Sequence, residues 1–435
     1  MKAGASRGAA RVTAGAASAM SAIALAVTLA APGARGDAPL PPWVGEGEVP
    51  PPSWARSVVG KASDGRTSRS GSLVLFSEPS RAAGRRGVGA SGASLPFFGA
   101  RRGSGCTGAW WLVGPLAWTC ADDADLSAES AEAPPRVVDA GGLSAQYAFI
   151  RSAGASAYAS MDAAEAGEAD QELESGWAVA VVERRERWAR TTKGLWIAQQ
   201  DLAMARPSTF EGARLVDGVL DVAWVLADRA PVWASSSPGA KEKPKDARAR
   251  FQLVHIREES GAMVRVDDGA WMFSRDLARP SRAPAPVEVT GPGERWIDVD
   301  STSQTLVAYE GSRAVYATLV STGRGAPGSP SVTPPGVHRI WVKIFASDMA
   351  NVQSQDIDPH YSLEDVPYVQ FFDDAVALHG TYWHGDFGHP RSHGCVNLAP
   401  LDAHWLFDFT EPRVPAGWDA AYPASVDPGS VVRVR

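Results

Sequence analysis

The sequence is poor in cysteine, has no excess of basic charge and, beyond its N-terminal region, has no long apolar run. Three cysteines in 435 residues exclude a small fold held together mainly by disulfides. The formal net charge of −7 gives no reason to expect nucleic acid as a partner. No later stretch is apolar enough over about 20 residues to span a bilayer. The chain is too long for one ordinary core, and its length predicts roughly three domains.

Residues 1–36 have the layout of an export signal peptide. Basic residues up to Arg11 precede an apolar stretch over residues 14–31, and small residues then lead to Gly36, after which we expect cleavage. A retained membrane anchor is the alternative, which the short and alanine-rich stretch disfavours. The sequence therefore predicts an exported protein of the periplasm or cell wall.

The cysteines fit an oxidising compartment. Cys106 and Cys120 lie fourteen residues apart in a tryptophan-rich stretch, and export would favour a disulfide between them. Such a bridge would stabilise its small domain by about 3 kcal/mol through the entropy of loop closure. Two unpaired, buried thiols are the alternative. If the bridge forms, Cys395 is the one free thiol of the chain, and a free thiol in an exported protein calls for a functional reason.

Three segments with a related layout are predicted between two proline-rich linkers, at residues 37–69 and 280–293. The segments span residues 70–125, 143–205 and 220–279. The clearest repeat pairs residues 194–202, GLWIAQQDL, with residues 269–277, GAWMFSRDL, and each is followed closely by Arg-Pro-Ser. Alternating apolar runs precede each copy and indicate small β barrels. These segments resemble bacterial SH3-like domains, whereas the polar residues 122–136 and 235–250 are predicted to be loops.

The last part of the chain, residues 294–435, is predicted to be mostly β, with one short helix. Proline at a first turn and the apolar spacing of residues 400–409 indicate that helix. A final strand at residues 430–434 could close the sheet. The other expected strands lie at residues 295–300, 305–309, 315–321, 337–344, 366–372 and 375–379.

A cysteine stands close to two histidines in this part of the chain. Cys395 directly follows His393 and Gly394, and His379 lies sixteen residues upstream, next to Gly380. A cysteine near pH 7 is mostly protonated, so a nearby imidazole must take its proton before the sulfur can attack a carbonyl. Glycines beside these groups let backbone N–H groups approach a developing oxyanion. The pattern indicates a nucleophilic thiol.

Residues 294–435 resemble the catalytic domain of L,D-transpeptidases of the YkuD type. The resemblance implies a mainly β protein, with a β-sandwich-like catalytic domain that carries a short helix and follows small SH3-like β-barrel repeats. It rests on the order and spacing of the elements Asp298-Val299-Asp300, Val320-Ser321-Thr322-Gly323, Thr333-Pro334-Pro335-Gly336, His379-Gly380-Thr381-Tyr382-Trp383 and Ser392-His393-Gly394-Cys395-Val396-Asn397.

This resemblance implies roles for the residues of the last two elements. Cys395 would be the nucleophile, and His379 the base, held by an oxygen of the next residue, Gly380. His393 and Gly394 stand beside the nucleophile, where backbone N–H groups are expected to form the oxyanion hole. Substrate-binding roles would fall on Ser392, Asn397, Trp383 and Tyr382.

The implied reaction is acyl transfer on the stem peptides of peptidoglycan, without a metal or organic cofactor. Cys395 would form a thioester with a tetrapeptide stem, release D-alanine and pass the acyl group to an amine. That amine could belong to a second stem or to an outer-membrane protein. With water as the acceptor the enzyme would be an L,D-carboxypeptidase.

Three further alternatives stay open. His379, His384, His389, His393 and Cys395 could supply zinc ligands, although no His-Glu-x-x-His motif is present. The protein could be another cell-wall cysteine amidase. It could also be a non-catalytic protein that binds the cell wall through its SH3-like segments.

Overall fold

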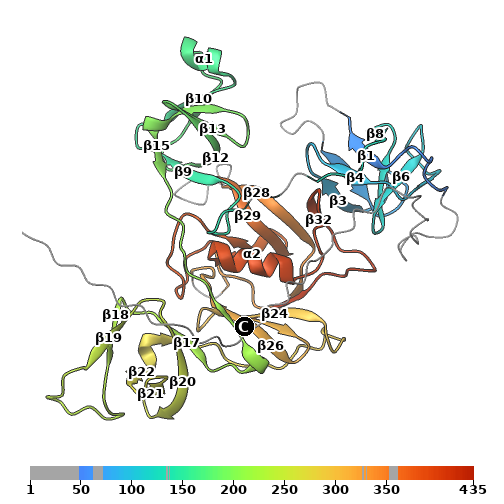
Figure 1. The fold of residues 1–435 in the computed structure, drawn as a ribbon. Coiled ribbons are helices and arrows are strands. Elements are labelled where there is room, and N and C mark those ends of the chain that lie inside the picture. Colours follow the sequence, from blue (N-terminus) through green and yellow to red (C-terminus); the bar gives the residue numbers. More distant parts are fainter. Residues whose placement is uncertain are drawn as a thin grey trace, which may run out of the picture. The chain divides into compact units, whose positions relative to one another are not determined.

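The computed structural model describes residues 49–61, 72–133, 136, 138–325, 328–329, 331–351 and 361–435. The predicted signal peptide, residues 1–36, lies outside this part of the chain, as does most of the first predicted linker. The described residues are mainly β and include two α-helices, α1 and α2, which confirms the predicted fold class (Figure 1). None of the helices found among them is long and apolar enough to cross a membrane.

A six-stranded sheet forms one layer of the C-terminal domain. Its order is β16-β26-β25-β24-β33-β27, with β24 antiparallel to β25 and parallel to the last strand, β33. The final strand therefore joins the sheet next to the first strand of the domain. The strands are β16 (Ala213–Arg214), β24 (Arg295–Asp300), β25 (Thr305–Glu310), β26 (Arg313–Leu319), β27 (Gly336–Arg339) and β33 (Val431–Val434).

A second group of strands carries the two motifs. β28 pairs antiparallel with β29, β29 pairs antiparallel with β30, and β30 runs parallel to β31. Helix α2 packs on β29 and β30, and apolar side chains between the helix and both groups of strands, such as Leu306, Leu378 and Leu406, form the core. The elements are β28 (Val342–Ala350), β29 (Ser362–Asp373), β30 (Val376–Gly380), β31 (Val396–Leu398), α2 (Pro400–Phe409) and β32 (Trp418–Ala421).

One predicted strand, at residues 337–344, is two strands in the structure. β27 pairs with β33, whereas β28 pairs with β29 and β32, so the chain passes from one sheet to the other between Arg339 and Val342. Ile340, between them, is fully buried. An unbroken apolar pattern cannot show such a change of partner, because both strands bury side chains.

The segments around residues 143–205 and 220–279 share one pairing scheme. In the first of them, β9 pairs with β12 and β15, β12 with β13, and β13 with β14. In the second, β17 pairs with β20 and β23, β20 with β21, and β21 with β22. A β-bulge interrupts the long strand, β12 or β20, at the same point in each segment. Both copies of the repeated sequence fold as a strand, a 3₁₀ turn and a strand.

The bounds of these elements are β9 (Gln146–Ile150), β10 (Ala155–Tyr158), α1 (Met161–Ala166), β11 (Gln171–Leu173), β12 (Ala178–Arg185), β13 (Trp188–Thr191), β14 (Trp196–Ala198), η1 (Gln199–Asp201), β15 (Leu202–Met204), η2 (Val216–Gly218), β17 (Val222–Val225), β18 (Arg229–Val232), β19 (Asp246–Ala249), β20 (Leu253–Ser260), β21 (Met263–Val266), β22 (Trp271–Phe273), η3 (Ser274–Asp276) and β23 (Leu277–Ala278). Strand β19 lies in a stretch that was predicted to be a loop.

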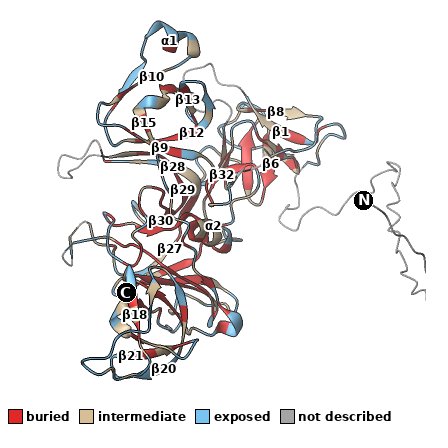
Figure 2. Cartoon of the chain, turned by 60° about the vertical axis from the view of Figure 1, so that its left-hand side comes forward, coloured by how far each residue is buried: buried red, intermediate tan, exposed pale blue. Residues whose placement is uncertain are grey.

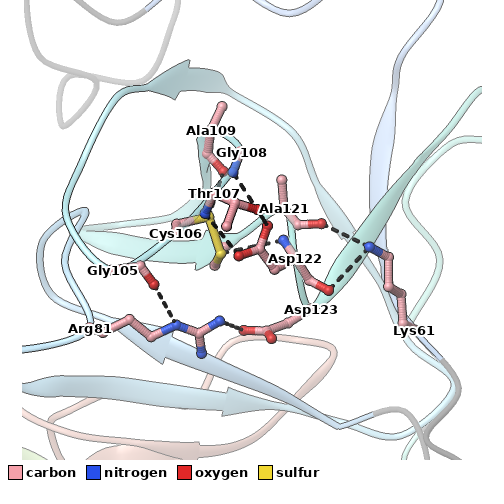
Figure 3. Close-up of a disulfide and its surroundings, with 11 residues drawn as sticks. Lys61, Arg81, Gly105, Cys106, Thr107, Gly108, Ala109, Ala121, Asp122 and Asp123 are labelled. Atoms are coloured by element: carbon pink, nitrogen blue, oxygen red, sulfur yellow. Dashed lines mark hydrogen bonds and ion pairs between the residues drawn. A yellow bond between two sulfur atoms is a disulfide. The ribbon is translucent and has the colours of Figure 1, made fainter.

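The first segment contains the disulfide. Cys106 and Cys120 are bonded to each other, and Cys120 ends β7 (Figure 3). Asp122, just after β7, accepts hydrogen bonds from the backbone and hydroxyl of Thr107. The elements are β1 (Ser57–Gly60), β2 (Leu73–Phe76), β3 (Arg85–Gly89), β4 (Ser94–Pro96), β5 (Gly99–Arg101), β6 (Trp110–Gly114), β7 (Ala117–Cys120) and β8 (Ala124–Ser127). β1 falls in the predicted linker and β8 in a predicted loop, and the two strands pair.

The first segment and the C-terminal domain share backbone hydrogen bonds and a core. β3 pairs antiparallel with β32. Trp418 of β32 is 1% exposed and packs among apolar side chains of the first segment, including Leu73 and Leu95. Figure 2 shows buried residues along the strands of each segment and exposed residues mainly at the turns and on α1. The pairing of β3 with β32 therefore makes residues before 294 part of the fold that holds the motifs.

Candidate active site

His379 lies near the end of β30, beside the strand that follows Cys395. In the parallel pairing of β30 with β31, His379 is opposite Asn397. The Nδ1–H of His379 donates to the carbonyl oxygen of Gly380 at 3.1 Å. Because this bond fixes the proton on Nδ1, Nε2 is the atom free to accept a proton. Burial lowers the pKa of His379 from 6.5 to about 4, so the ring is neutral at neutral pH.

Cys395 stands immediately before β31 and is partly buried. Burial raises the pKa of its thiol, and a hydrogen bond with the backbone of Ala377 opposes the shift. It is the free cysteine of the described residues, since the other two are bonded to each other. A raised thiol pKa and a lowered imidazole pKa favour a neutral pair, so the thiol must lose its proton as it attacks.

Hydrogen bonds within and around residues 392–395 hold the backbone in front of the cysteine. The hydroxyl of Ser392 donates to the carbonyl of Cys395 and accepts from the N–H of Gly394, which is 3.1 Å away. Gly394 has a φ of 131°, which favours glycine. Thr333 donates to the Gly394 carbonyl at 2.7 Å. The Gly394 N–H is thus already bonded, and the N–H of Cys395 is the better candidate for an oxyanion donor.

A cavity of about 1170 Å³ opens over the cysteine. Its wall includes Cys395, His379, Ser392, His393, Asn397 and Trp383, which are six of the residues predicted for the site. Arg324 adds a positive charge, and Phe149 and Gly176 come from the segment 143–205. The structure thus brings most of the predicted site residues to one cavity large enough for a peptide.

Among the predicted site residues, His393 is exposed, whereas Tyr382 is buried. His393 is exposed, and its ring stacks on Tyr361 with centroids 6.0 Å apart. Tyr382 is 1% exposed, donates its hydroxyl to the carbonyl of Glu364 and stacks on Tyr147. Tyr382 is not among the residues that line the cavity. Its position suits packing beneath the site, rather than the substrate contact expected from the sequence.

His384, which the sequence suggested only as a possible zinc ligand, is a buried residue of the cavity wall. Its side chain lines the cavity and lies 3.0 Å from the side-chain amide of Asn397, while its Nδ1 accepts the N–H of Asp386 at 3.2 Å. Burial, and to a smaller extent the charge of Arg391, lowers the pKa of His384 to about 3. The only sequence signal was its place five residues after His379, and a histidine in a loop is more often a surface residue.

Around Cys395, the described histidines do not bring three ligand atoms close enough together to share one metal ion. Among the residues that the structure describes, the one group of three or more His, Cys, Asp or Glu side chains close enough to share an ion is Cys106, Cys120 and Asp122. The two sulfurs of that group are joined in the disulfide, so they are not available as thiolate ligands.

Comparison with known proteins agrees with this geometry. Residues 294–434 match the family model of the YkuD L,D-transpeptidase catalytic domain. No curated protein matches the chain. Among solved structures, the chain is similar to L,D-transpeptidases from Enterococcus faecium (22% identity, 33% of this chain and 50% of that chain, TM-score 0.25), Xylanimonas cellulosilytica (20%, 35% and 64%, TM-score 0.24) and Mycobacterium smegmatis (18%, 54% and 89%, TM-score 0.26).

The chain spans about half of the Enterococcus faecium structure that it matches. The match to the family model, over residues 294–434, includes both β30 and the loop that ends at Cys395. Residues 294–434 are an L,D-transpeptidase catalytic domain of the YkuD family.

Proposed function

We propose that the protein is an exported peptidoglycan L,D-transpeptidase that works through a thioester on Cys395. One observation supports this proposal above the others. The bond from His379 Nδ1 to the Gly380 carbonyl leaves Nε2 unprotonated, and His379 lines the same cavity as Cys395. A base with a free acceptor nitrogen and a free thiol on the wall of one cavity are the groups that thioester chemistry needs.

In the first step, the sulfur of Cys395 attacks the carbonyl that joins the third residue of a tetrapeptide stem to the terminal D-alanine. His379 Nε2 takes the thiol proton, and the N–H of Cys395 donates to the oxyanion. The C–N bond then breaks, the amine of D-alanine leaves with the proton from His379, and the thioester remains.

In the second step, an amine attacks the thioester carbonyl and gives its proton to His379. The C–S bond breaks, and Cys395 leaves as a thiol when the proton returns to sulfur. The acceptor amine belongs to a second stem peptide or to a protein side chain, such as one of an outer-membrane protein. Water as the acceptor would give an L,D-carboxypeptidase, which is the second candidate.

The three segments before the catalytic domain are part of the same proposal. We regard them as SH3-like modules, because two of them share one order of strands and one 3₁₀ turn before the last strand. Phe149 and Gly176 bring the module of residues 143–205 to the cavity wall. This module would therefore contact part of a bound stem peptide.

The test is to incubate the purified protein with muropeptides that carry tetrapeptide stems and to follow the products by mass spectrometry. The wild type should release D-alanine and gain the mass of the acyl group, whereas Cys395→Ala should do neither. A crosslinked, protein-linked or trimmed product would identify the acceptor. Persistence of the reaction in EDTA would exclude a zinc hydrolase, and absence of D-alanine release from the wild type would refute the proposal.

A further inference from the structure

His384 and Asn397 form a buried pair on the wall of the cavity that contains Cys395. Asn397 is 3% exposed, and one atom of its side-chain amide lies 3.0 Å from Nε2 of His384. The other polar atom of that amide is buried and has no hydrogen-bond partner among the described residues. An unpartnered buried oxygen is costly, so the orientation of the amide matters.

The orientation of the Asn397 amide depends on which ring nitrogen of His384 carries the proton. Nδ1 of His384 faces the backbone N–H of Asp386, which can only donate, so Nδ1 must be the unprotonated nitrogen. The ring is neutral because burial keeps its pKa low, and its single proton is therefore on Nε2. The atom of Asn397 that faces Nε2 must then be an acceptor, which is the amide oxygen. Oxygen and nitrogen of an amide are assigned from such hydrogen bonds.

With the amide in this orientation, its NH2 group takes the position that has no protein partner. Asn397 now offers a donor rather than an acceptor beside the two residues of the proposed chemistry, His379 and Cys395, with which it lines the cavity. We propose that His384 is a positioning residue, which holds the Asn397 amide with its NH2 group directed to an acceptor oxygen of the donor stem peptide.

Hydrogen bonds and an ion pair hold the turn that carries His384. The Asp386 carbonyl accepts the Ser321 hydroxyl at 2.9 Å, and Ser321 exchanges backbone hydrogen bonds with Asn397. The carboxylate of Asp386 forms an ion pair with Arg250 of the segment 220–279, at 2.5 Å. The turn that orients His384 is therefore fixed both to the strand that carries Asn397 and to a residue outside the catalytic domain.

This inference rests on the proposed function, because it names the group that contacts the stem peptide. Two variants separate a donor at position 384 from an acceptor. His384→Gln can still donate to the Asn397 oxygen, whereas the carboxylate of His384→Glu can only accept and would turn the NH2 group away from the substrate. His389→Gln, at an exposed histidine of the same loop, is the matched control.

The measurement is kcat/KM for D-alanine release from a tetrapeptide stem, with the melting temperature of each variant. His384→Gln and the control should stay within about threefold of the wild type, and His384→Glu should lose about tenfold or more, as expected for one lost hydrogen bond. Asn397→Asp should lose a similar factor, and the double variant His384→Glu/Asn397→Asp should lose no more than either single change. Equal rates for the Gln and Glu variants would overturn the inference.

A measurement on the wild type keeps the inference testable if His384→Glu does not fold. In ¹⁵N-histidine-labelled protein, NMR should show the proton of His384 on Nε2 and none on Nδ1. A proton on Nδ1 would overturn the inference even if D-alanine is released. Conversely, a wild type that releases no D-alanine would refute the proposed function, while the NMR result would still report the arrangement of His384.

Discussion

His379 should remain neutral, and the enzyme active, at a pH where an ordinary histidine is protonated. The side chain is 2% exposed, and this burial lowers its pKa from 6.5 to about 4 despite the hydrogen bond to the Gly380 carbonyl. At pH about 5.5, a histidine with a pKa of about 6.5 would be about nine-tenths protonated, whereas one with a pKa of about 4 would be about 3% protonated. The base would then lose almost none of its activity at that pH.

The assay is kcat/KM for D-alanine release as a function of pH, together with an NMR titration of the His379 ring. Both should show a midpoint near pH 4, with little change above about pH 5. A fall in activity with a midpoint near 6.5, matched by the titration of His379, would refute the argument from burial. A fall near 6.5 without titration of His379 would point to a different group.

The same shift should appear in the stability of the protein. The unfolded chain binds more protons than the folded one between pH 4 and 6.5, so the contribution of His379 is fully present above 6.5 and is lost as the pH falls toward 4. A shift from 6.5 to about 4 corresponds to about 3 kcal/mol of unfolding free energy. His379→Gln, which does not titrate, should remove that part of the pH dependence in urea denaturation.

Three other changes should alter stability in ways that equilibrium denaturation can measure. Asp402→Ala should cost about 3 to 5 kcal/mol, because the buried carboxylate accepts hydrogen bonds from two hydroxyls and the Gly212 N–H; an unchanged midpoint would contradict this. Replacement of Cys106 and Cys120 by serine should cost about 3 kcal/mol and leave D-alanine release by the folded enzyme unchanged. Tyr147→Ala should cost about 3 to 5 kcal/mol and Tyr147→Phe about 1 kcal/mol, and equal losses would argue against the ring stack on Tyr382.

The sequence predicted the local elements of the catalytic domain well. The first strand, Arg295–Asp300, and the helix, Pro400–Phe409, have the bounds that were predicted. Both have strong local signals, a short alternating run in one case and a proline at the first turn in the other. Helix α1 was missed, although Ser160 caps its start and Gly167 ends it with a positive φ. At six residues, α1 gave little periodicity to detect.

What the sequence could not show are the partners of these elements. Nothing in the pattern of β32 indicates that it pairs with β3, which is more than 300 residues away in the chain, because register and partner depend on the whole fold. The same holds within the site. The motifs predicted Cys395 and His379, but the place of His384 against Asn397 depends on how the loop between them folds.

The packing of Trp418 against the first segment determines which shorter fragments of the protein could fold. A fragment cut at the family boundary, residue 294, would keep β32 but lose β3, so one edge of β32 would have unpaired backbone groups. It would also expose an indole ring that is now 1% exposed. Such a fragment should aggregate or fold poorly, and the smallest stable form of this enzyme should begin upstream of β1. The limits of the catalytic family and the limits of the folding unit are therefore different in this chain.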